Sequence, residues 1–388
     1  MHNDVSTGDK SDMLEIREVL TKSDRKKFIQ FQNDLYRNVE NYIPTLMMDE
    51  MANLDPRKNP AYDFCDSRQW LCYREGEIVG RVGAIISYAA NDIWKQKRLR
   101  FTRIDFIEDY EVFCLLMKTV EDWARELGME EVIGPMGFCD FDKEGLLVDG
   151  FDELGMFITY YNHPYYAEFL ERYGYEKEVD WVENKVYVQN HDKERIDRIC
   201  AHIAKKHKVR LVPIKRRSQV KPFIEPIFDL INEAYRILFE VAPITDRQKE
   251  YYKDQFLILL NLNYLGLMVD ENDRLVCLGI VAPSFADALR KNQGRLFPFG
   301  WIPMLKEIRK PKHLDMYFVA VRDEYKSAGL PAVMLNHMTE VAAKNGVEYA
   351  ETGPELEYNY NVQGLWAGHE IKHNFKRRRC YKRRIAEE

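Results

Sequence analysis

The sequence predicts an α+β protein built from two tandem domains of the same fold. The chain has 388 residues, which is more than a single hydrophobic core usually supports, so two domains of roughly 200 residues each are expected. Strand and helix patterns also recur in the same order in both halves, which indicates an internal duplication. We place a polar segment at residues 1–13, domains at 14–189 and 208–388, and a connecting helix at 190–207.

The composition is that of a globular protein and excludes several function classes. Apolar residues make up 46% and charged residues 31%, and the net charge of -6 gives no overall reason to bind nucleic acid or an acidic membrane. The seven cysteines are scattered without a Cys-x-x-Cys pair, which favours reduced thiols and a cytoplasmic location. Neither a signal-peptide core nor a run of about 18 apolar residues occurs, so we expect no membrane partner.

The first half begins with short strands and one helix. A strand at 14–19 precedes a helix that runs from an Asp24 cap to Tyr36, and a long polar loop follows. Residues 69–74 and 78–87 form a hairpin around a turn glycine, and a strand at 99–107 comes next.

A strong amphipathic pattern then predicts a helix over 110–127, stopped by Gly128. The half closes with a strand at 131–134, a helix at 164–173 that ends at Gly174, and a strand at 179–188.

The second half repeats this order after the connecting helix. We expect strands at 208–214, 264–269, 275–281 and 314–321, helices at 222–239 and 246–260, and an apolar insertion at 284–310 that forms either a lid or packing between the halves. In each half an acidic residue and a tyrosine lead a helix that ends in Gly, and a Gly-Pro pair and an asparagine follow. The pairs are Gly134-Pro135 and Gly353-Pro354, and the asparagines are Asn162 and Asn361.

This order of elements resembles the GNAT superfamily of acyl-CoA-dependent acyltransferases. The resemblance covers about 14–188 and 208–385, and implies in each domain a mixed, mostly antiparallel sheet flanked by helices. It is sharpest in the second half, where Phe-Val-Ala-Val at 318–321 precedes a loop that ends in Gly329-Leu330-Pro331.

The resemblance also implies where an acyl-CoA co-substrate binds. The backbone of Val319 and Val321 would meet the pantetheine arm. Lys326 would meet the pyrophosphate, with Gly329 and Ala332 in the loop at a helix N-terminus, where backbone N–H groups and the helix dipole favour an anion. Lys326 replaces the usual Arg or Gln and Pro331 replaces a small residue, so a turn that only enters the helix is the alternative.

In the first half the corresponding loop, 106–111, carries three carboxylates and no glycine. Carboxylates repel a diphosphate, so we expect no CoA site there and interpret the residues as a capped helix start. The tyrosine general acid of the family is also absent, because Leu170 and Trp366 occupy the matched stretches. Tyr160, Tyr161, Tyr165 and Tyr166 crowd the nearby loop as core or groove residues.

Two glutamates of the second half are candidates for the base that deprotonates an amine. Glu355 and Glu357 follow the last-but-one strand, although Glu357 also suits a structural cap. Substrate contacts are expected from Tyr358, Tyr360, Asn361 and Trp366.

Eight Lys or Arg residues lie in 372–384, which suits either a solvated edge strand or contact with phosphate or RNA. Among nine histidines only His369 and His373 share helical spacing, so no metal is expected. The function that fits best is acyl transfer from acetyl-CoA or another acyl-CoA to an unidentified small-molecule or peptide amine. The alternatives are a non-catalytic binding protein and an aminoacyl-tRNA-dependent transferase.

Overall fold

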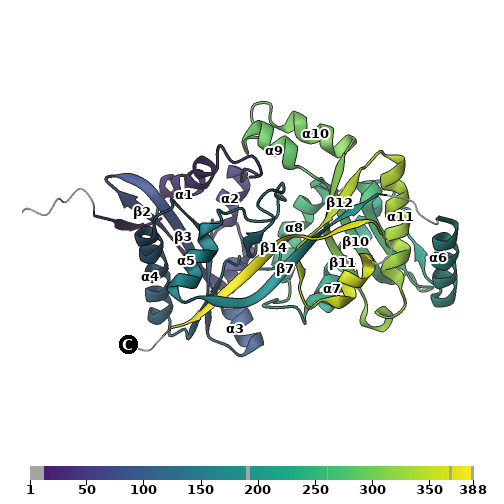
Figure 1. Cartoon of the computed structure of the whole chain (residues 1–388). Coiled ribbons are helices and arrows are strands. Elements are labelled where there is room, and N and C mark those ends of the chain that lie inside the picture. The colour runs from purple at the N-terminus through teal and green to yellow at the C-terminus, as the bar shows by residue number, and fades with distance from the viewer. Residues whose placement is uncertain (1–12, 189–192, 260, 367–368, 386–388) are drawn as a thin grey trace, which may run out of the picture. The chain divides into compact units, whose positions relative to one another are not determined.

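The computed structural model describes residues 13–188, 193–259, 261–366 and 369–385 (Figure 1). The chain divides into two compact units. The first unit comprises the described residues of Met1–Leu147, Tyr160–Glu178 and Arg379–Glu388, and the second those of Val148–Thr159 and Val179–Arg378. The end of the chain therefore contributes to the first unit, so no single cut in the sequence separates the two.

The sheet of the first unit has one parallel pair among antiparallel neighbours. Its order is β1, β2, β3, β4, β5 and the last residues of β14, and only β4 and β5 are parallel. This confirms the predicted α+β class. The bounds are Glu15–Glu18, Cys65–Arg74, Glu77–Ser87, Arg98–Phe106, Glu131–Gly134 and Ile371–Arg384.

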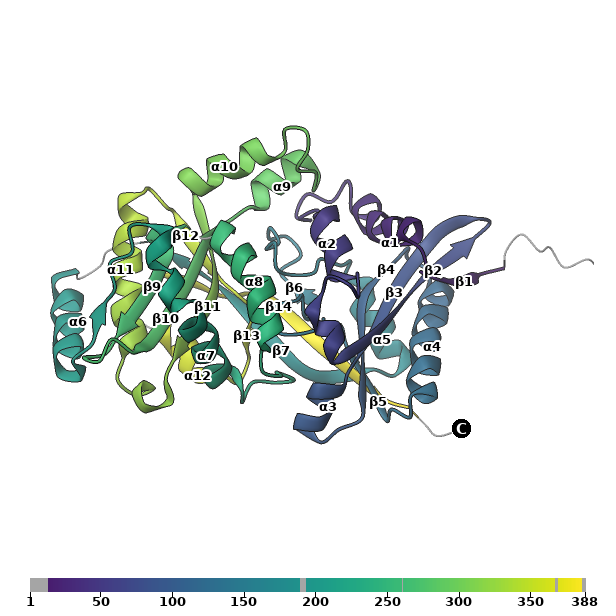
Figure 2. The same ribbon diagram turned by 180° about the vertical axis from the view of Figure 1, so that it is seen from behind.

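Helices cover both faces of this sheet. Figure 1 shows α4 and α5 in front of β2 and β3, and Figure 2, from behind, shows α2 in front. The predicted Asp24 cap is wrong, because Thr21 is the N-cap of α1. The Thr21 hydroxyl accepts a hydrogen bond from the Asp24 N–H, and the Asp24 carboxylate accepts one from the Thr21 N–H. The predicted polar loop also contains α2. The bounds of α1 to α5 are Lys22–Leu35, Met47–Asn53, Tyr88–Trp94, Tyr110–Glu126 and Tyr165–Tyr173.

The sheet of the second unit follows the order β7, β12, β11, β10, β9, β8, again with one parallel pair, β11 with β12. The short strand β13 pairs with β7. The strand expected at 208–214 shrinks to the two residues of β8. The bounds are Glu176–Tyr187 for β7, Tyr349–Thr352 for β12, His313–Val321 for β11, Leu275–Pro283 for β10, Leu265–Val269 for β9, Arg210–Leu211 for β8, Glu355–Leu356 for β13 and, elsewhere, Leu146–Asp149 for β6.

In the second unit α11 packs on one face of the sheet and α7 on the other, as the two views show. Helix α6 packs against α11 rather than only linking the halves. The insertion forms two helices, α9 and α10. The bounds of α6 to α12 are Lys193–His207, Ile224–Tyr235, Asp246–Leu259, Ala286–Asn292, Trp301–Arg309, Leu330–Lys344 and Tyr360–Gln363; 3-10 turns lie at Pro60–Asp63, Arg217–Gln219, Lys221–Phe223, Leu262–Tyr264, Asp323–Tyr325 and Gly364–Trp366.

Candidate functional site

The central strands of the second unit part from one another in the middle of the sheet. The ladder between β11 and β12 ends at Met316 and Thr352, with a last bond of 2.9 Å from the Gly353 N–H to the Met316 carbonyl. Strand β11 continues to Val321, whereas the chain after β12 turns to pair with β7. The backbone of β11 beyond Met316 therefore has an edge that β12 does not cover.

The loop after β11 leads into α11 through a left-handed glycine. Gly329 has φ +73° and is the N-cap of α11, a conformation that glycine adopts without steric cost. Pro331 lies in the first turn, where its missing N–H breaks no helical bond. Lys326 is exposed and pairs with Asp323 at 2.7 Å. Ala332, the third residue of α11, is exposed.

The two valines assigned to the pantetheine arm lie on this open part of β11. Val319 and Val321 are both half-buried. The Val319 carbonyl accepts a hydrogen bond of 3.3 Å from the Tyr235 hydroxyl of α7. At the strand end the Glu233 carboxylate accepts from the Asp323 N–H at 3.0 Å and pairs with Arg322. Helix α7 thus brings both a phenol and a carboxylate to this edge.

Glu355, a predicted base, is buried on β13 beside another predicted site residue. The Trp366 indole N–H donates to its Oε1 at 2.9 Å, and the Asn184 amide donates to its Oε2 at 3.3 Å. Burial raises the pKa of Glu355 to about 7, although the bonds from Trp366 and Thr352 oppose the rise. A carboxyl with this pKa can exchange protons near neutral pH.

The other predicted residues of this stretch are more open. The Glu357 carboxylate accepts from the Asp180 N–H at 3.2 Å and pairs with Arg377 at 3.4 Å, contacts that a structural role explains. Tyr358 and Tyr360 are 49% and 75% exposed, and Asn361 is exposed. The structure brings Glu355 and Trp366 together, whereas Tyr358, Tyr360 and Asn361 have exposed side chains.

A cluster of buried charges lies at the start of β11 and β12. Glu183 of β7 pairs with Arg378 and, at 3.0 Å, with Lys376 of β14, and Lys376 also reaches Glu351 of β12 at 3.0 Å. Lys376 and Arg378 are 0% and 1% exposed. The expectation that the basic strand would be solvated is therefore wrong for these two residues, because buried carboxylates from distant strands neutralise them.

Asp315 of β11 belongs to this cluster and was missed by the sequence analysis. It faces Glu351 across the parallel ladder and is 1% exposed. Its Oδ2 has no hydrogen-bond partner among the described residues. Burial, reinforced by Glu351, raises the pKa of Asp315 to about 8, against a hydrogen bond with Ser284 and the charge of Lys376 that lower it.

Asp315 lines a small recess of the second unit. The recess has a cavity volume of about 10 Å³, the room that one water-sized group needs. Carboxylates dominate its lining, with one histidine and one tyrosine. The polar lining residues are Ser284, Asp287, Glu307, His313, Asp315, Tyr349 and Glu351.

In the first unit tyrosines cover the equivalent edge. The β4–β5 ladder ends at Arg100 and Ile133. At the far end of β4 the Phe106 N–H donates to the Tyr166 hydroxyl at 2.9 Å, and the Tyr165 hydroxyl donates to the Phe106 carbonyl at 2.7 Å. The backbone that a pantetheine arm would use is thus already hydrogen bonded.

The helix that follows this strand is also satisfied by its own cap. The Asp109 carboxylate accepts from the N–H groups of Glu111 and Val112 and pairs with Arg74 at 2.7 Å. This confirms the interpretation of the acidic loop as a capped helix start. An open groove of about 700 Å³ lies beside it, and two carboxylates, Glu108 and Glu168, are part of its lining.

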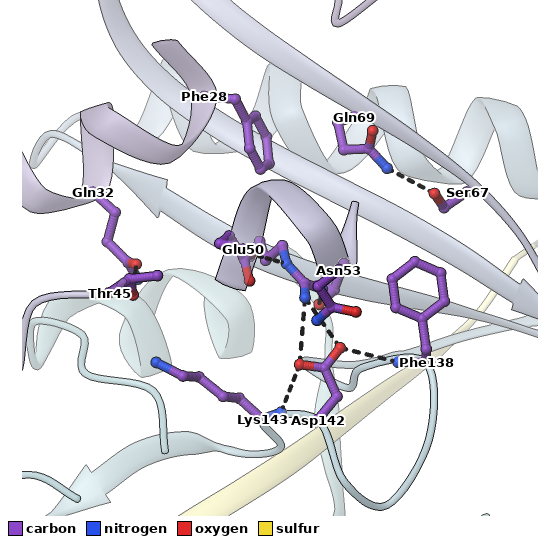
Figure 3. A network of polar contacts seen from close by, with 12 residues as sticks. Phe28, Gln32, Thr45, Glu50, Asn53, Ser67, Gln69, Phe138, Asp142 and Lys143 are labelled. Carbon is purple, nitrogen blue, oxygen red and sulfur yellow. Dashed lines mark hydrogen bonds and ion pairs between the residues drawn. The ribbon is translucent and has the colours of Figure 1, made fainter. Parts of the chain in front are cut away.

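A second buried polar network lies in the first unit (Figure 3). Arg103, which is 2% exposed, pairs with Glu50 and, at 3.0 Å, with Asp142. Figure 3 shows the Lys143 side chain extending away from the Asp142 carboxylate. Burial lowers the pKa of Lys143 to about 8, against the attraction of Glu50 and Asp142. Nothing in the local sequence pattern indicated these contacts.

Over the described residues no helix is long and apolar enough to cross a membrane, and no group of three or more His, Cys, Asp or Glu side chains is arranged to hold a metal. The seven cysteines all lie among the described residues, form no disulfide there, and five of them are buried.

No family model matches the chain. It is 27% identical over 384 residues to protein YghO of Escherichia coli, which covers 95% of each chain. It is 24% identical over 358 residues to the bacterial ceramide synthase of Caulobacter vibrioides, which covers 89% of this chain and 91% of that one.

Among solved structures, a tandem GNAT protein from the clavulanic acid biosynthesis pathway matches 97% of this chain and 100% of its own, with a TM-score of 0.57 and 12% identity. A GCN5-related glucosamine N-acetyltransferase region of a fungal β-N-acetylglucosaminidase matches 96% of this chain and 38% of its own, with a TM-score of 0.55 and 13% identity. With the two units and their parted strands, these likenesses show that the chain has the tandem GNAT fold.

Proposed function

We propose that the chain is an acyl-CoA-dependent N-acyltransferase whose site lies in the second unit. The proposal rests on one observation above the others: a buried carboxyl of β11, Asp315, has an oxygen without a hydrogen-bond partner among the described residues and lines a recess. In the first unit Tyr165, Tyr166 and Asp109 occupy the corresponding backbone groups, so we assign no CoA site there.

The second unit fits the co-substrate in two respects. The edge of β11 beyond Met316 offers backbone groups of Val319 and Val321 to an amide-containing arm, which would replace the Tyr235 hydroxyl at the Val319 carbonyl. The start of α11 at Gly329 offers helix N–H groups and a dipole to a diphosphate, and Lys326 adds a positive charge. Three carboxylates lie at this loop, and each is paired with a cation: Glu233 with Arg322, Asp323 with Lys326, and Glu324 with Arg274. A diphosphate would therefore take Lys326 from Asp323.

Charge balance favours an amine as the acceptor. The buried cluster holds three carboxyls, on Glu183, Asp315 and Glu351, and two cations, on Lys376 and Arg378. With every group ionised it carries one excess negative charge, which a buried site tolerates poorly. Either one proton or one ligand cation removes that excess. An ammonium group has the size of the recess and supplies the charge.

The chemistry follows from this placement. Asp315 accepts a proton from the bound ammonium, the free amine attacks the thioester carbonyl, and the carbon–sulfur bond breaks to give an amide and the CoA thiolate, which takes up a proton. The pKa of Asp315, raised to about 8 by burial, lies close enough to that of an alkyl ammonium for the transfer to be fast. Tyr235, whose hydroxyl lies at Val319, is our candidate for the proton donor to sulfur.

Glu355 is the second candidate for the base. The pKa of its carboxyl, raised to about 7 by burial, suits proton transfer near neutral pH. Both of its oxygens, however, already accept hydrogen bonds, from Trp366 and Asn184. The roles predicted for Glu357, Tyr358, Tyr360 and Asn361 stay predictions.

The acceptor that we propose is a long-chain amino alcohol. The relative from Caulobacter vibrioides is named a bacterial ceramide synthase and aligns over 91% of its length, and a ceramide is the amide that forms when such an amine is acylated. The tRNA-dependent alternative is less favoured, because two of the eight cations of the basic strand, Lys376 and Arg378, already pair with buried carboxylates.

A CoA-release assay tests the proposal. Purified protein is given acetyl-CoA or palmitoyl-CoA with either sphinganine or a short amino alcohol, and thiol release and amide formation are measured. We expect amide formation with at least one pair and a loss of about 100-fold or more in Asp315→Asn. Release with no amide, or equal rates in the variant, would contradict the mechanism. CoA binding without any turnover would favour a non-catalytic binding protein.

A further inference from the structure

The insertion of the second unit exposes an unusual number of apolar side chains. Helix α9 is anchored by the buried residues Phe285, Ala288 and Leu289. Helix α10, in contrast, has no buried residue along its nine positions. Five of the fifteen exposed large hydrophobic side chains of the described residues lie within 297–305: Phe297 at 75%, Phe299 at 70%, Trp301 at 45%, Ile302 at 50% and Leu305 at 40%. We call these five the apolar patch.

Exposed apolar patches of this kind mark a site where the protein docks on another protein or on a membrane. The backbone of the patch is held in place: the Asn292 amide donates to the Gly300 carbonyl at 2.9 Å, and the Asn261 amide donates to the Ile308 carbonyl at 2.9 Å. Figure 2 shows α9 and α10 joined by a short connection, and the exposed aromatic side chains belong to this connection and to the start of α10.

The same segment carries a strong positive charge. Residues 285–312 hold seven Lys or Arg and two Asp or Glu, a net charge of +5 in a chain whose total is -6. The rest of the chain is accordingly acidic, at -11. The local excess of cations is thus a property of this segment and not of the protein.

Five of these seven cations are placed to meet an external anion. Lys291, Arg295, Lys306, Arg309 and Lys310 are exposed, and no ion pair links any of them to a carboxylate in the part of the chain that the structure describes. Elsewhere exposed basic residues commonly have such partners, as Lys208 does with Glu271 at 2.9 Å.

We call these five exposed cations the basic rim. We propose that the apolar patch and the basic rim dock the protein on the surface of a bilayer that contains anionic lipids. Trp and Phe side chains beside Lys and Arg are the composition of helices that lie in the interface plane, with the rings at the acyl boundary and the cations at the headgroups. Docking of this kind needs no helix that crosses the bilayer, and the described residues contain none that could.

This inference revises our expectation that the protein has no membrane partner. It rests on the proposed function only for its purpose: a long-chain amine and a long acyl chain reside in membranes, and docking would bring the second unit to them. The binding itself requires no turnover and is measured without substrate.

Vesicle flotation with the full chain tests the docking. Vesicles of phosphatidylcholine alone are compared with vesicles that contain about 30% phosphatidylglycerol, at low and high salt. We expect binding to the anionic vesicles that weakens with salt. The triple variant Phe297→Ser, Phe299→Ser, Trp301→Ser should lower the partition coefficient by about 100-fold or more, because the buried apolar area is lost.

A charge-reversal variant probes the rim. Lys306→Glu, Arg309→Glu, Lys310→Glu should lower binding to anionic vesicles by at least about 100-fold and leave any weak binding to neutral vesicles unchanged. The matched control reverses Lys205 and Lys206 on α6, which are also exposed, and should change binding by a few fold at most.

The proposal is overturned if the wild-type chain floats with neither kind of vesicle, or if both patch variants bind as the wild type does. Sedimentation velocity identifies the rival occupant: a dimer that the apolar variant converts to monomers, without vesicle binding, would assign the patch to a second copy. Failure of the acyl-transfer assay with intact vesicle binding would leave the docking standing and remove the proposed function.

Discussion

Replacing Asp315 with asparagine should make the protein more stable at alkaline pH. The pKa of this carboxyl is raised from 3.8 to about 8 by burial. Between these two values the native state keeps a proton that the unfolded chain has released. The stabilisation is therefore complete below pH 3.8 and is lost as the pH rises through 8, with a slope of about 1.4 kcal/mol per pH unit.

Asparagine keeps the shape and has no proton to lose, so this slope disappears. Between pH 6 and pH 8 the free energy of unfolding of Asp315→Asn should rise by roughly 2 kcal/mol relative to that of the wild type. Glu355 titrates in both proteins, so its contribution cancels in the difference. Glu351 faces Asp315, so the difference reports the titration of this pair of carboxyls.

Urea unfolding at pH 6, 7 and 8 measures the effect, followed by intrinsic fluorescence and by circular dichroism because a chain of two units need not unfold in one step. Asp92→Asn is the control, since the Asp92 side chain is 83% exposed in an ion pair with Lys95. A difference between Asp315→Asn and the wild type that stays constant with pH would refute the reasoning, because it would mean that Asp315 is ionised throughout.

Three further substitutions test other parts of the account. Arg103→Met should cost about 3–5 kcal/mol of stability, because it leaves the carboxylates of Glu50 and Asp142 buried without their cation; urea denaturation measures it. Tyr166→Phe should cost about 1–3 kcal/mol, because the Phe106 N–H loses its acceptor; thermal unfolding measures it. Glu355→Gln should lower the rate of acyl transfer less than tenfold, because its oxygens are engaged and Asp315 is the base.

Each of these has a result that would count against it. The side chain of Arg17 is 52% exposed and pairs with Glu15 at the surface, so Arg17→Met should cost much less stability than Arg103→Met. An equal loss in the two variants would contradict the stabilising role of the buried network. An unchanged unfolding temperature in Tyr166→Phe would mean that water replaces the hydroxyl. A larger kinetic effect of Glu355→Gln than of Asp315→Asn would exchange the two assignments.

Local signals predicted the local structure well. The glycine at 174 ends α5 in a left-handed conformation, with φ +99°, as expected of a helix stop. The hairpin turn at Glu75-Gly76 and the amphipathic pattern of α4 also matched the structure. The N-cap of α1 was misplaced by three residues because Thr21 and Asp24 form a capping box in which either residue alone resembles a cap.

The site was less accessible to sequence reasoning, because its contacts are distant along the chain. Asp315 is a single acidic residue in an otherwise apolar strand, and its significance comes from Glu351 and from Lys376, which arrive on other strands. A solvated strand was one interpretation of β14, because the alternation of side chains identifies the two faces of a strand but not what packs against each face. Glu183 lies 195 residues from Arg378, its buried partner, and no local pattern predicts that pairing.

Calorimetry with CoA and acetyl-CoA tests whether the second unit binds an acyl-CoA at the start of α11. The decisive comparison is between Gly329→Asp and Gly346→Asp, because both glycines have nearly the same positive φ, +73° and +74°, at the two ends of this region of the chain. Lys326→Ala accompanies them to remove the proposed phosphate contact.

We expect the wild-type chain to bind CoA. Gly329→Asp should abolish this binding, Lys326→Ala should weaken it by roughly tenfold, and Gly346→Asp should leave it intact. Absence of binding to the wild-type chain, or equal binding by all variants, would contradict the claim that this unit holds the co-substrate.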